Sequence, residues 1–197
     1  MINKPAITSE KIDPLMQNRW SPRAFDSNKP IEDSVMSSLL EAARWAPSCM
    51  NEQPWRFLIC SQEKDQLAWQ KLLTCLGEKN QLWAQHAPVL ILAVAMNNFA
   101  QTNKLNRWAS YDTGDASMSL CLQATALGLI THQMGGFDAE QCREGFNLPD
   151  DCSPLSIIAV GYQAKPDHLD DEMKQKEEAE RTRAPASTRF FYGHWDE

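Results

Sequence analysis

The sequence predicts a single layered domain of the α/β or α+β class, with helices packed on a central sheet. Its 197 residues, 43% of them apolar, are enough to bury one hydrophobic core. The run Pro88–Met96 is almost entirely apolar, but it has only about half of the roughly 20 residues that a membrane-spanning helix needs, so we expect a buried strand. Helical and extended patterns also alternate along the chain, as in a sheet covered by helices.

The clearest helix is expected at Glu32–Ala46, where apolar residues are spaced for one face, Asp33 or Ser34 serves as cap and Pro47 ends the helix. Trp108–Leu127 is almost apolar all round after its first turns, which is typical of a central helix rather than a peripheral one. The other elements expected, in chain order, are a helix in Ser9–Asn18, a strand at Trp55–Cys60, a helix at Glu63–Leu76, an extended segment at Ile130–Met134, a helix at Ala139–Phe146 capped by Asp138, and a strand at Leu155–Gly161.

The C-terminal segment 163–197 differs from the rest of the chain. It is rich in charge, which leaves disorder open as one interpretation. Four aromatic residues lie within its last eight positions, however, and aromatic side chains bury a large apolar area when they pack. We therefore expect one domain over residues 1–197, with 163–197 forming an arm that reaches over a second copy of the chain.

Composition excludes several classes of function. The net charge of −7 argues against binding to a nucleic-acid backbone, which needs clustered Lys and Arg. The six cysteines form no CxxC pair and the N-terminus has no apolar secretory core, so reduced thiols and a cytoplasmic location are expected. The four histidines lack HxxxH or HExxH spacing, so no metal site is expected. GxSxG, P-loop and GxGxxG motifs are absent as well.

Arginines supply the first candidate binding group. Arg19-Trp-Ser-Pro-Arg23 brings together two guanidinium groups and a hydroxyl, which suits a phosphate monoester, although a solvated turn would look the same. Arg181 and Arg183, far along the chain, form a second pair that could face the same anion.

Two further loops could contact a flat ligand. In Pro47–Trp55, the Asn51 amide can donate and accept in one plane, as needed to read an imide or amide edge of a heterocycle, although Asn and Pro also favour an ordinary turn. In His132–Asp138, two adjacent glycines allow the backbone to approach a ligand and point an N–H at it, although a plain strand end is the commoner use of glycine.

Taken together and in this order, these segments resemble the nitroreductase family of FMN-dependent enzymes. The resemblance runs from about Gln17 to the end of the chain. The motifs that carry it are Arg19-Trp-Ser-Pro-Arg-Ala-Phe25, Ala46-Pro-Ser-x-x-Asn51-x-Gln-Pro-Trp-Arg-Phe57, Tyr111-Asp-Thr-Gly114, Gly128-Leu129, His132-Gln-Met-Gly-Gly-Phe-Asp138, Gly161-Tyr162 and Arg181-x-Arg183-x-Pro185.

The resemblance implies an α+β, nitroreductase-like fold: a central, mostly antiparallel or mixed sheet wrapped by helices. It also implies a homodimer with FMN at the subunit interface and a C-terminal arm that extends onto the partner subunit. Cys49-Met50 departs from the smaller or polar residues often found there, and Arg181 stands where Lys is also common. These departures concern the shape of the substrate more than the binding of FMN.

The site residues that the resemblance implies fall into three groups, and it implies no catalytic side chain and no metal. The FMN phosphate, ribityl chain and pyrimidine edge would be contacted by Arg19, Trp20, Ser21 and Arg23, and the phosphate site would be completed by Arg181 and Arg183. The isoalloxazine ring would be lined by Pro47, Ser48 and Asn51, with the partner subunit as one possible source of these residues. Met134 would lie beside the ring, with the N–H groups of Gly135 or Gly136 aimed at N5. The best candidate for a cap over the ring is Asn97–Trp108. Replacing Gly136 by valine is expected to obstruct the binding of the ring.

The implied function is that of an oxidoreductase. NADH or NADPH, as a transient donor, would reduce FMN, and two electrons would then pass by a ping-pong mechanism to a nitroaromatic, quinone or similar small-molecule acceptor. The missing GxGxxG fits this scheme, because a nicotinamide that stacks on a flavin needs no dinucleotide-binding fold of its own. The alternatives are a flavin-binding or flavin-processing protein with little turnover, or an FMN enzyme of the same fold with another redox reaction, such as dehydrogenation or dehalogenation.

Overall fold

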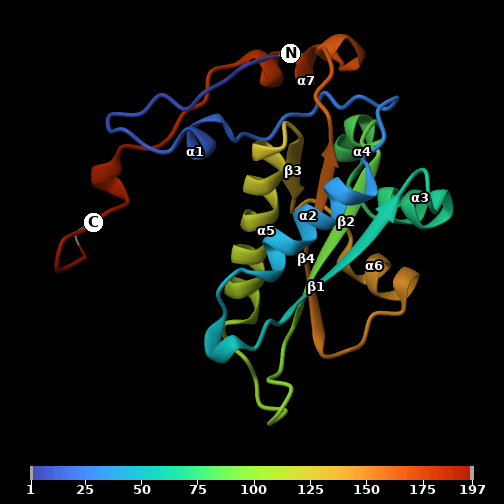
Figure 1. Cartoon of the computed structure of the whole chain (residues 1–197), viewed down its shortest axis with the longest axis vertical. Coiled ribbons are helices and arrows are strands. Elements are labelled where there is room, and N and C mark those ends of the chain that lie inside the picture. Colours follow the sequence, from blue (N-terminus) through green and yellow to red (C-terminus); the bar gives the residue numbers. More distant parts are fainter. Residues whose placement is uncertain (1, 196–197) are drawn as a thin grey trace.

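The computed structural model describes residues 2–195 and is built on one four-stranded sheet (Figure 1). Its strands lie in the order β1-β2-β4-β3, and every neighbouring pair is antiparallel. The bounds are β1 Trp55–Ser61, β2 Val89–Met96, β3 Ile130–Met134 and β4 Cys152–Gly161. The described sheet is thus antiparallel throughout, which confirms the expected α+β class.

Helices cover both faces of the sheet. One face packs against α2 (Asp33–Arg44) and α5 (Ala109–Ala126), and the other packs against α3 (Gln66–Thr74), α4 (Glu78–Ala84) and α6 (Ala139–Phe146). Strand β2 is buried on both faces, since its residues alternate between the two cores. Leu90, Leu92 and Val94 join the core under α3 and α4, whereas Val89, Ile91 and Ala93 join the core under α2 and α5.

Two of the expected helices begin or end elsewhere. The first helix, α1, spans only Pro14–Asn18 instead of Ser9–Asn18, because proline at its first position and the Asp13 side chain, which accepts from the Leu15 N–H at 2.8 Å, define its start. Helix α2 begins at Asp33 itself, with Glu32 as N-cap and no capping side chain, so the prediction of an Asp33 or Ser34 cap was wrong. Asp33 instead lies in the first turn, where its charge favours the helix dipole.

Two helices were missed. Instead of one helix over Glu63–Leu76, the chain forms α3, capped by the Asp65 carboxylate, and then turns at Gly77 into α4. The charge-rich stretch after Gln163 contains α7 (Asp171–Glu178), whose cap Asp170 accepts from the Met173 N–H at 2.7 Å. Short 3₁₀ turns occur at Cys49–Asn51, Pro166–His168 and Ala186–Thr188.

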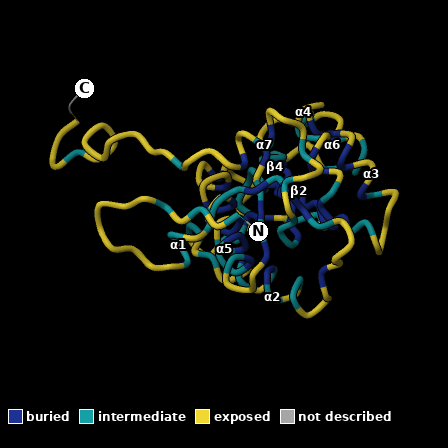
Figure 2. Tube along the Cα trace, turned by 90° about the horizontal axis from the view of Figure 1, so that it is seen from above, coloured by how far each residue is buried: buried dark blue, intermediate teal, exposed yellow. Residues whose placement is uncertain are grey.

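The segment after α7 leaves the body of the molecule. Residues 163–179 still pack on the body, since Gln163 bridges to Phe25 and Met173 is buried in the core. Residues 180–195, which we call the C-terminal arm, extend away from it and are mostly exposed (Figure 2). Phe190, Tyr192 and Trp195 are 73%, 95% and 76% exposed. Trp195 contacts Phe191 within the arm, with ring centroids 4.9 Å apart, but these three large side chains remain largely open to solvent.

Neither a membrane-spanning helix nor a metal-ligating cluster occurs among residues 2–195. No helix there combines the length and the apolar character needed to cross a membrane. In the same described range, no three or more His, Cys, Asp or Glu side chains gather in a way that could hold a metal ion. All six cysteines are free, and five of them are buried.

Gly161, at the end of β4, gives a test of the packing. A Cβ atom there would lie 2.7 Å from Pro88 Cδ and 2.9 Å from Phe25 Cδ1. Because both are ring atoms with little freedom to move, we expect Gly161→Ala to lower the free energy of unfolding by about 1–3 kcal/mol and the melting temperature by about 2–12 °C. Thermal unfolding of Gly77→Ala, whose Cβ would meet nothing closer than 3.4 Å, is the matched control. Equal melting temperatures for the two variants would contradict this packing.

Candidate functional site

Three arginines gather where the N-terminal segment meets the C-terminal arm. Arg19 Nη1 donates to Ser21 Oγ at 3.3 Å. Arg181 lies close to both Arg19 and Arg183; its pKa is lowered mainly by burial and further by these two positive charges. Within residues 2–195, none of the three forms an ion pair with a carboxylate. We call Arg19, Arg181 and Arg183 the arginine cluster, and its uncompensated charge suits an anion such as a phosphate.

Backbone carbonyls hold the arginine cluster in place. Arg181 Nη1 donates to the carbonyl oxygens of Lys4 at 2.9 Å and Gln17 at 2.8 Å. The Ala6 N–H donates to the same Gln17 carbonyl at 2.8 Å. The N-terminal segment around Lys4 and Ala6 is therefore tied between α1 and the start of the C-terminal arm. These bonds bring together arginines that are more than 160 positions apart.

Trp20 and Arg23 lie beside the arginine cluster. The Lys4 ammonium stands 4.4 Å from the centre of the Trp20 ring, a cation–π contact. Arg19 and Trp20 also line a cavity of about 210 Å³, together with Thr125 and Gly128 from the end of α5. The backbone N–H of Arg23 donates to the buried Glu177 carboxylate at 2.9 Å. The sequence-predicted residues Arg19, Trp20, Ser21, Arg23, Arg181 and Arg183 thus lie at one end of the molecule.

His132 forms the floor below the Arg19–Arg23 loop. Its Nδ1 lies 3.0 Å from the carbonyl oxygen of Pro22, so this ring nitrogen carries the proton and donates, and its ring packs on Trp83 with centroids 4.6 Å apart. Burial, with smaller contributions from the charges of Arg23 and Arg19, lowers the pKa of His132 to about 4. The imidazole is therefore neutral at neutral pH, and it positions the loop rather than adding charge to it.

Gly135 and Gly136 form the corner at the end of β3. The Gly136 carbonyl accepts from the Gly77 N–H at 3.0 Å and from Asn80 Nδ2 at 3.2 Å, which fixes the corner to the start of α4. Among the described residues, neither glycine N–H has a hydrogen-bond acceptor, and both glycines are exposed. The Met134 side chain is buried in the core under α3 and α4, so at this corner Met134 can offer a ligand only its backbone.

The two glycines differ in what an added side chain would contact. A Cβ atom at Gly136 would point at Asn80 Nδ2, 3.2 Å away, whereas a Cβ atom at Gly135 would meet nothing within 4 Å. The expectation that valine at Gly136 obstructs the ring stays a prediction, and the same substitution would also displace the Asn80 side chain. Gly135 is the position that faces open space.

The Pro47–Asn51 loop is fixed to the start of α5. The Cys49 N–H donates to Asp112 Oδ2 at 3.0 Å, and Ser48 Oγ accepts from the Gln53 N–H at 3.0 Å. Met50 and Asn51 have φ values of 54° and 57°, a left-handed conformation that non-glycine residues rarely adopt. Pro47 and Asn51 are exposed, so this loop offers its outer edge to a ligand or to another chain.

A hairpin over residues 97–106 lies against this loop. Glu52 Oε1 accepts from the Ala100 N–H at 2.7 Å, which joins the two segments. Between them is a cavity of about 310 Å³ with a mixed lining of apolar, polar and charged side chains. It is bounded by Met50, Glu52, Phe99, Gln101, Thr102, Lys104 and Leu105. The hairpin covers most of the predicted cap at Asn97–Trp108.

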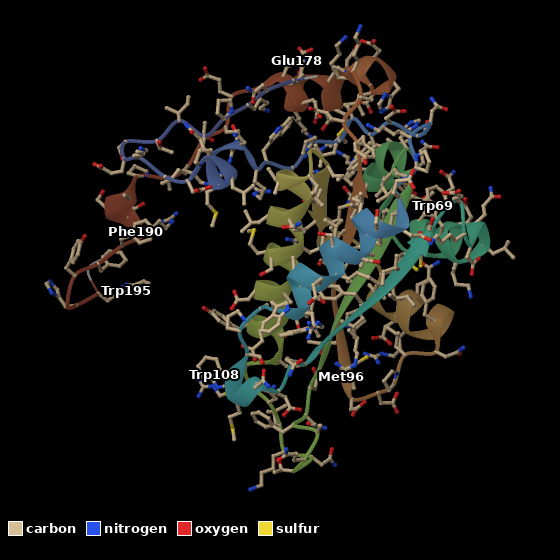
Figure 3. The ribbon with its side chains drawn as sticks, in the orientation of Figure 1. Trp69, Met96, Trp108, Glu178, Phe190 and Trp195 are labelled. Carbon is tan, nitrogen blue, oxygen red and sulfur yellow. The ribbon has the colours of Figure 1, made fainter. Side chains whose placement is uncertain are left out.

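The arginine cluster and the Pro47–Asn51 loop lie at opposite ends of α5. Asp112, which holds the loop, and Thr125, which lines the cavity beside Arg19, are about 20 Å apart along the helix at 1.5 Å per residue. Figure 3 shows the same separation, with Trp108 at one end of α5 and Glu178, on α7, beyond the other. Within one chain, therefore, these two parts of the predicted site are not brought together.

Helix α5 keeps an open apolar face. It packs against the sheet, as expected of a central helix, but Trp108, Tyr111, Met118 and Leu127 at its ends and along it are exposed. The expected central position of this helix is confirmed, and part of its apolar surface stays exposed. Large apolar side chains that remain exposed along a helix indicate a surface that another molecule covers.

Sequence reasoning missed several residues of this region. Glu177 lies in a stretch so rich in charge that it looked like a solvated segment, and no sequence signal separated it from its neighbours. Asn80 belongs to a helix that was not predicted at all. Asp112 could have been predicted from the sequence, because it belongs to the Tyr111-Asp-Thr-Gly114 motif at the start of the long helix.

Comparison with known proteins gives consistent matches. The family model described as the nitroreductase family matches residues 16–162. A crystal structure of an oxidoreductase containing FMN has a TM-score of 0.91 and 32% sequence identity, and the match covers 100% of this chain and 99% of the other. A nitroreductase family protein of Clostridium difficile 630 has a TM-score of 0.71 and 26% identity, with 92% and 97% covered. The Bacillus subtilis protein YdgI, provisionally named an NAD(P)H nitroreductase, is 28% identical over 186 residues, covering 76% of this chain and 87% of its own.

Proposed function

This chain belongs to the nitroreductase family, and from that premise we propose that it is an FMN-dependent oxidoreductase that takes electrons from NADH or NADPH. The observation that carries the proposal is the arginine cluster: it forms no ion pair with a carboxylate within residues 2–195, and it lies at one end of a fold shared with an oxidoreductase containing FMN. FMN, when bound, supplies reversible two-electron chemistry. The chain itself has to bind the cofactor, orient it and leave one face of the ring accessible.

The residues present fit the phosphate and the ring edge. Arg19, Arg181 and Arg183 would bind the phosphate, with Ser21 Oγ as an additional donor, and Trp20 would flank the ribityl chain. Arg23 would face the pyrimidine edge, where its positive charge stabilises the negative charge that develops on reduction. The free N–H groups at Gly135 and Gly136 would donate to N5, since a strand end with two unbonded donors can approach a flat ring.

We also propose that each site is completed by a second copy of the chain. Pro47, Ser48 and Asn51 would line the isoalloxazine ring of the partner's cofactor, because within one chain they lie about 20 Å along α5 from the arginine cluster. The open apolar face of α5 would form the interface between the two copies. The C-terminal arm would then pack its aromatic side chains on the partner, since Phe190, Tyr192 and Trp195 stay largely exposed in the single chain.

The proposed acceptors are nitroaromatic compounds, quinones or similar small molecules, and the reaction is ping-pong. Donor and acceptor would use the same pocket in turn, closed by the hairpin at 97–106, whose Phe99 and Leu105 offer apolar contacts and whose Lys104 offers one charge. We assign no catalytic side chain, because His132 is neutral and bonded to Pro22, and Glu177 is buried. Water would supply the protons. The six free thiols fit the reducing environment of the cytoplasm, which is the proposed compartment.

The redox proposal predicts a colour change. Purified protein is expected to be yellow, to bleach on anaerobic addition of NADH or NADPH, and to regain its absorbance near 450 nm (roughly the flavin band) when a quinone or nitroarene is added. Visible absorption spectroscopy gives the result. Yellow protein that neither nicotinamide bleaches would contradict the reductase and favour a flavin-binding protein or a different donor.

Gly135→Val tests the placement of the ring. The added side chain enters space that is open in the single chain, so the fold should tolerate it, whereas a ring held against this corner would be displaced. We expect a folded protein whose bound FMN falls below about a tenth of the wild-type content, since both N5 donors lose their approach. The ratio of flavin to protein after gel filtration measures this. Gly136→Ala, whose Cβ contacts only the flexible Asn80 side chain, is the control and should keep most of its FMN; full flavin content in Gly135→Val would place the ring elsewhere.

A further inference from the structure

A single buried carboxylate joins the segments that carry the arginines. Glu177, on α7, is fully buried, and its two carboxylate oxygens accept from the backbone N–H of Arg23 at 3.0 and 2.9 Å. Its Oε1 also accepts from the Ala24 N–H at 3.2 Å. No ion pair involving Glu177 occurs within residues 2–195, so backbone donors rather than a charged side chain satisfy it.

The end of α7 is also bonded to the N-terminal segment at Lys4. Lys4 Nζ donates to the Glu177 carbonyl oxygen at 2.8 Å, and four residues further along the chain Arg181 donates to the Lys4 carbonyl. The end of α7 therefore fixes the Arg19–Arg23 loop on one side and Arg181 on the other. The relative positions of Arg19 and Arg181 depend on this link.

The Glu177 carboxylate also changes the electrostatics around the nearby cations. Burial raises the pKa of Glu177, whereas the two N–H donors and the positive charges of Arg23 and Lys4 oppose that shift. A buried carboxylate is a costly way to stabilise a fold, since an apolar side chain often does as well. Here it satisfies two N–H groups at the loop that carries Arg19 and Arg23, and it offsets the repulsion among neighbouring cations before any anion binds.

We propose that Glu177 is a positioning residue for phosphate binding: by accepting the N–H groups of Arg23 and Ala24, it holds the Arg19–Arg23 loop in the conformation in which Arg19 and Arg181 can contact one anion. This inference rests on the proposed binding of FMN. It assigns to α7, a helix outside the matched residues 16–162, a role in selecting a phosphorylated flavin.

Riboflavin, which has the same ring but no phosphate, separates positioning from a general structural role. The experiment measures dissociation constants of FMN and riboflavin for the apoprotein by quenching of flavin fluorescence. In Glu177→Leu we expect the affinity for FMN to fall at least about tenfold more than the affinity for riboflavin, because the phosphate contacts of Arg19 and Arg181 are lost for FMN alone, whereas contacts of Trp20 and Arg23 are shared by both flavins. Glu177→Gln keeps one acceptor oxygen and should restore FMN binding to within about threefold of wild type.

Two further variants complete the design. Met173→Ala truncates another buried side chain of α7 that does not bond to the loop; it should lower the melting temperature and leave the ratio of the two dissociation constants at the wild-type value. Glu177→Asp keeps the charge but withdraws the oxygens by one methylene, so it should lose FMN selectivity as Glu177→Leu does. It provides the same measurement if the leucine variant does not fold.

The outcomes distinguish the possibilities. Equal weakening of FMN and riboflavin, a wild-type ratio in Glu177→Leu and Glu177→Asp, or a Glu177→Gln variant as defective as Glu177→Leu would each overturn the positioning role. Wild-type protein that binds neither flavin would overturn the proposed function instead.

Discussion

Replacing Arg19 by alanine is expected to weaken FMN binding about 10- to 100-fold, with riboflavin binding unchanged. The Arg19 guanidinium has no carboxylate partner in the described part of the chain and stands close to Arg181, so its loss removes a charge-assisted phosphate contact worth roughly 1.5–3 kcal/mol. The fold should persist, because among residues 2–195 the Arg19 side chain donates only to Ser21 Oγ, and the bond from its backbone N–H to the Leu15 carbonyl is kept in the variant. Fluorescence titration of the apoprotein with each flavin measures both affinities.

A control variant that removes one positive charge elsewhere distinguishes a direct phosphate contact from an effect of the protein's overall charge. Lys64→Ala removes the same charge at the turn after β1, where Lys64 pairs with Asp33 on the surface, and it should leave FMN affinity within about twofold of wild type. If Arg19→Ala binds FMN as tightly as wild type, or if Lys64→Ala loses as much affinity, the phosphate does not lie at the arginine cluster.

Mixing two variants that each fail to retain FMN is expected to restore flavin binding. One chain carries Arg19→Ala together with Arg183→Ala, and the other carries Pro47→Trp, so each homodimer has two defective sites. In a mixed dimer, both defects fall in one site and the other is intact. Random pairing gives about half mixed dimers, so about a quarter of the wild-type flavin content should return. Co-refolding followed by gel filtration, at an FMN concentration that neither variant alone retains, gives the measurement.

This result depends on where the two halves of the site lie. If Pro47 and the arginine cluster of one chain contacted the same cofactor, every chain in the mixture would carry a defect and no flavin would return. Mixing each variant with itself under the same conditions controls for refolding losses. The separation along α5 favours restoration.

Much of the fold could be predicted from sequence, because the elements that form the core have strong patterns. The apolar run to Met96 gave β2, and the long apolar stretch after Trp108 gave α5 to within a residue at each end. Helices α4 and α7 were missed because each is short and mostly polar. Each is stabilised by one or two buried side chains, such as Trp83 in α4 and Met173 in α7, whose partners lie elsewhere in the chain.

The candidate site likewise has some features that the sequence could predict and others that it could not. Residue type made Arg19, Arg23, Gly135 and Gly136 candidates, but a solvated turn or a plain strand end would use the same residues, so their roles came from the resemblance to the family and remain predictions. The direction of a missing side chain at Gly136 could not be predicted, because it depends on Asn80 in a helix packed against the corner. Nor could the burial of Glu177, since a carboxylate is buried only where backbone donors from another segment meet it.

The position of the Pro47–Asn51 loop at the far end of α5 has a consequence for handling the protein. If two chains share each site, cofactor retention and subunit association are thermodynamically linked, and mass action applies to both. Dilution below the dissociation constant of the subunits would then release flavin even when free cofactor is plentiful. Conversely, saturating cofactor would tighten the pair, so the apparent strength of association should rise with the flavin concentration in the buffer.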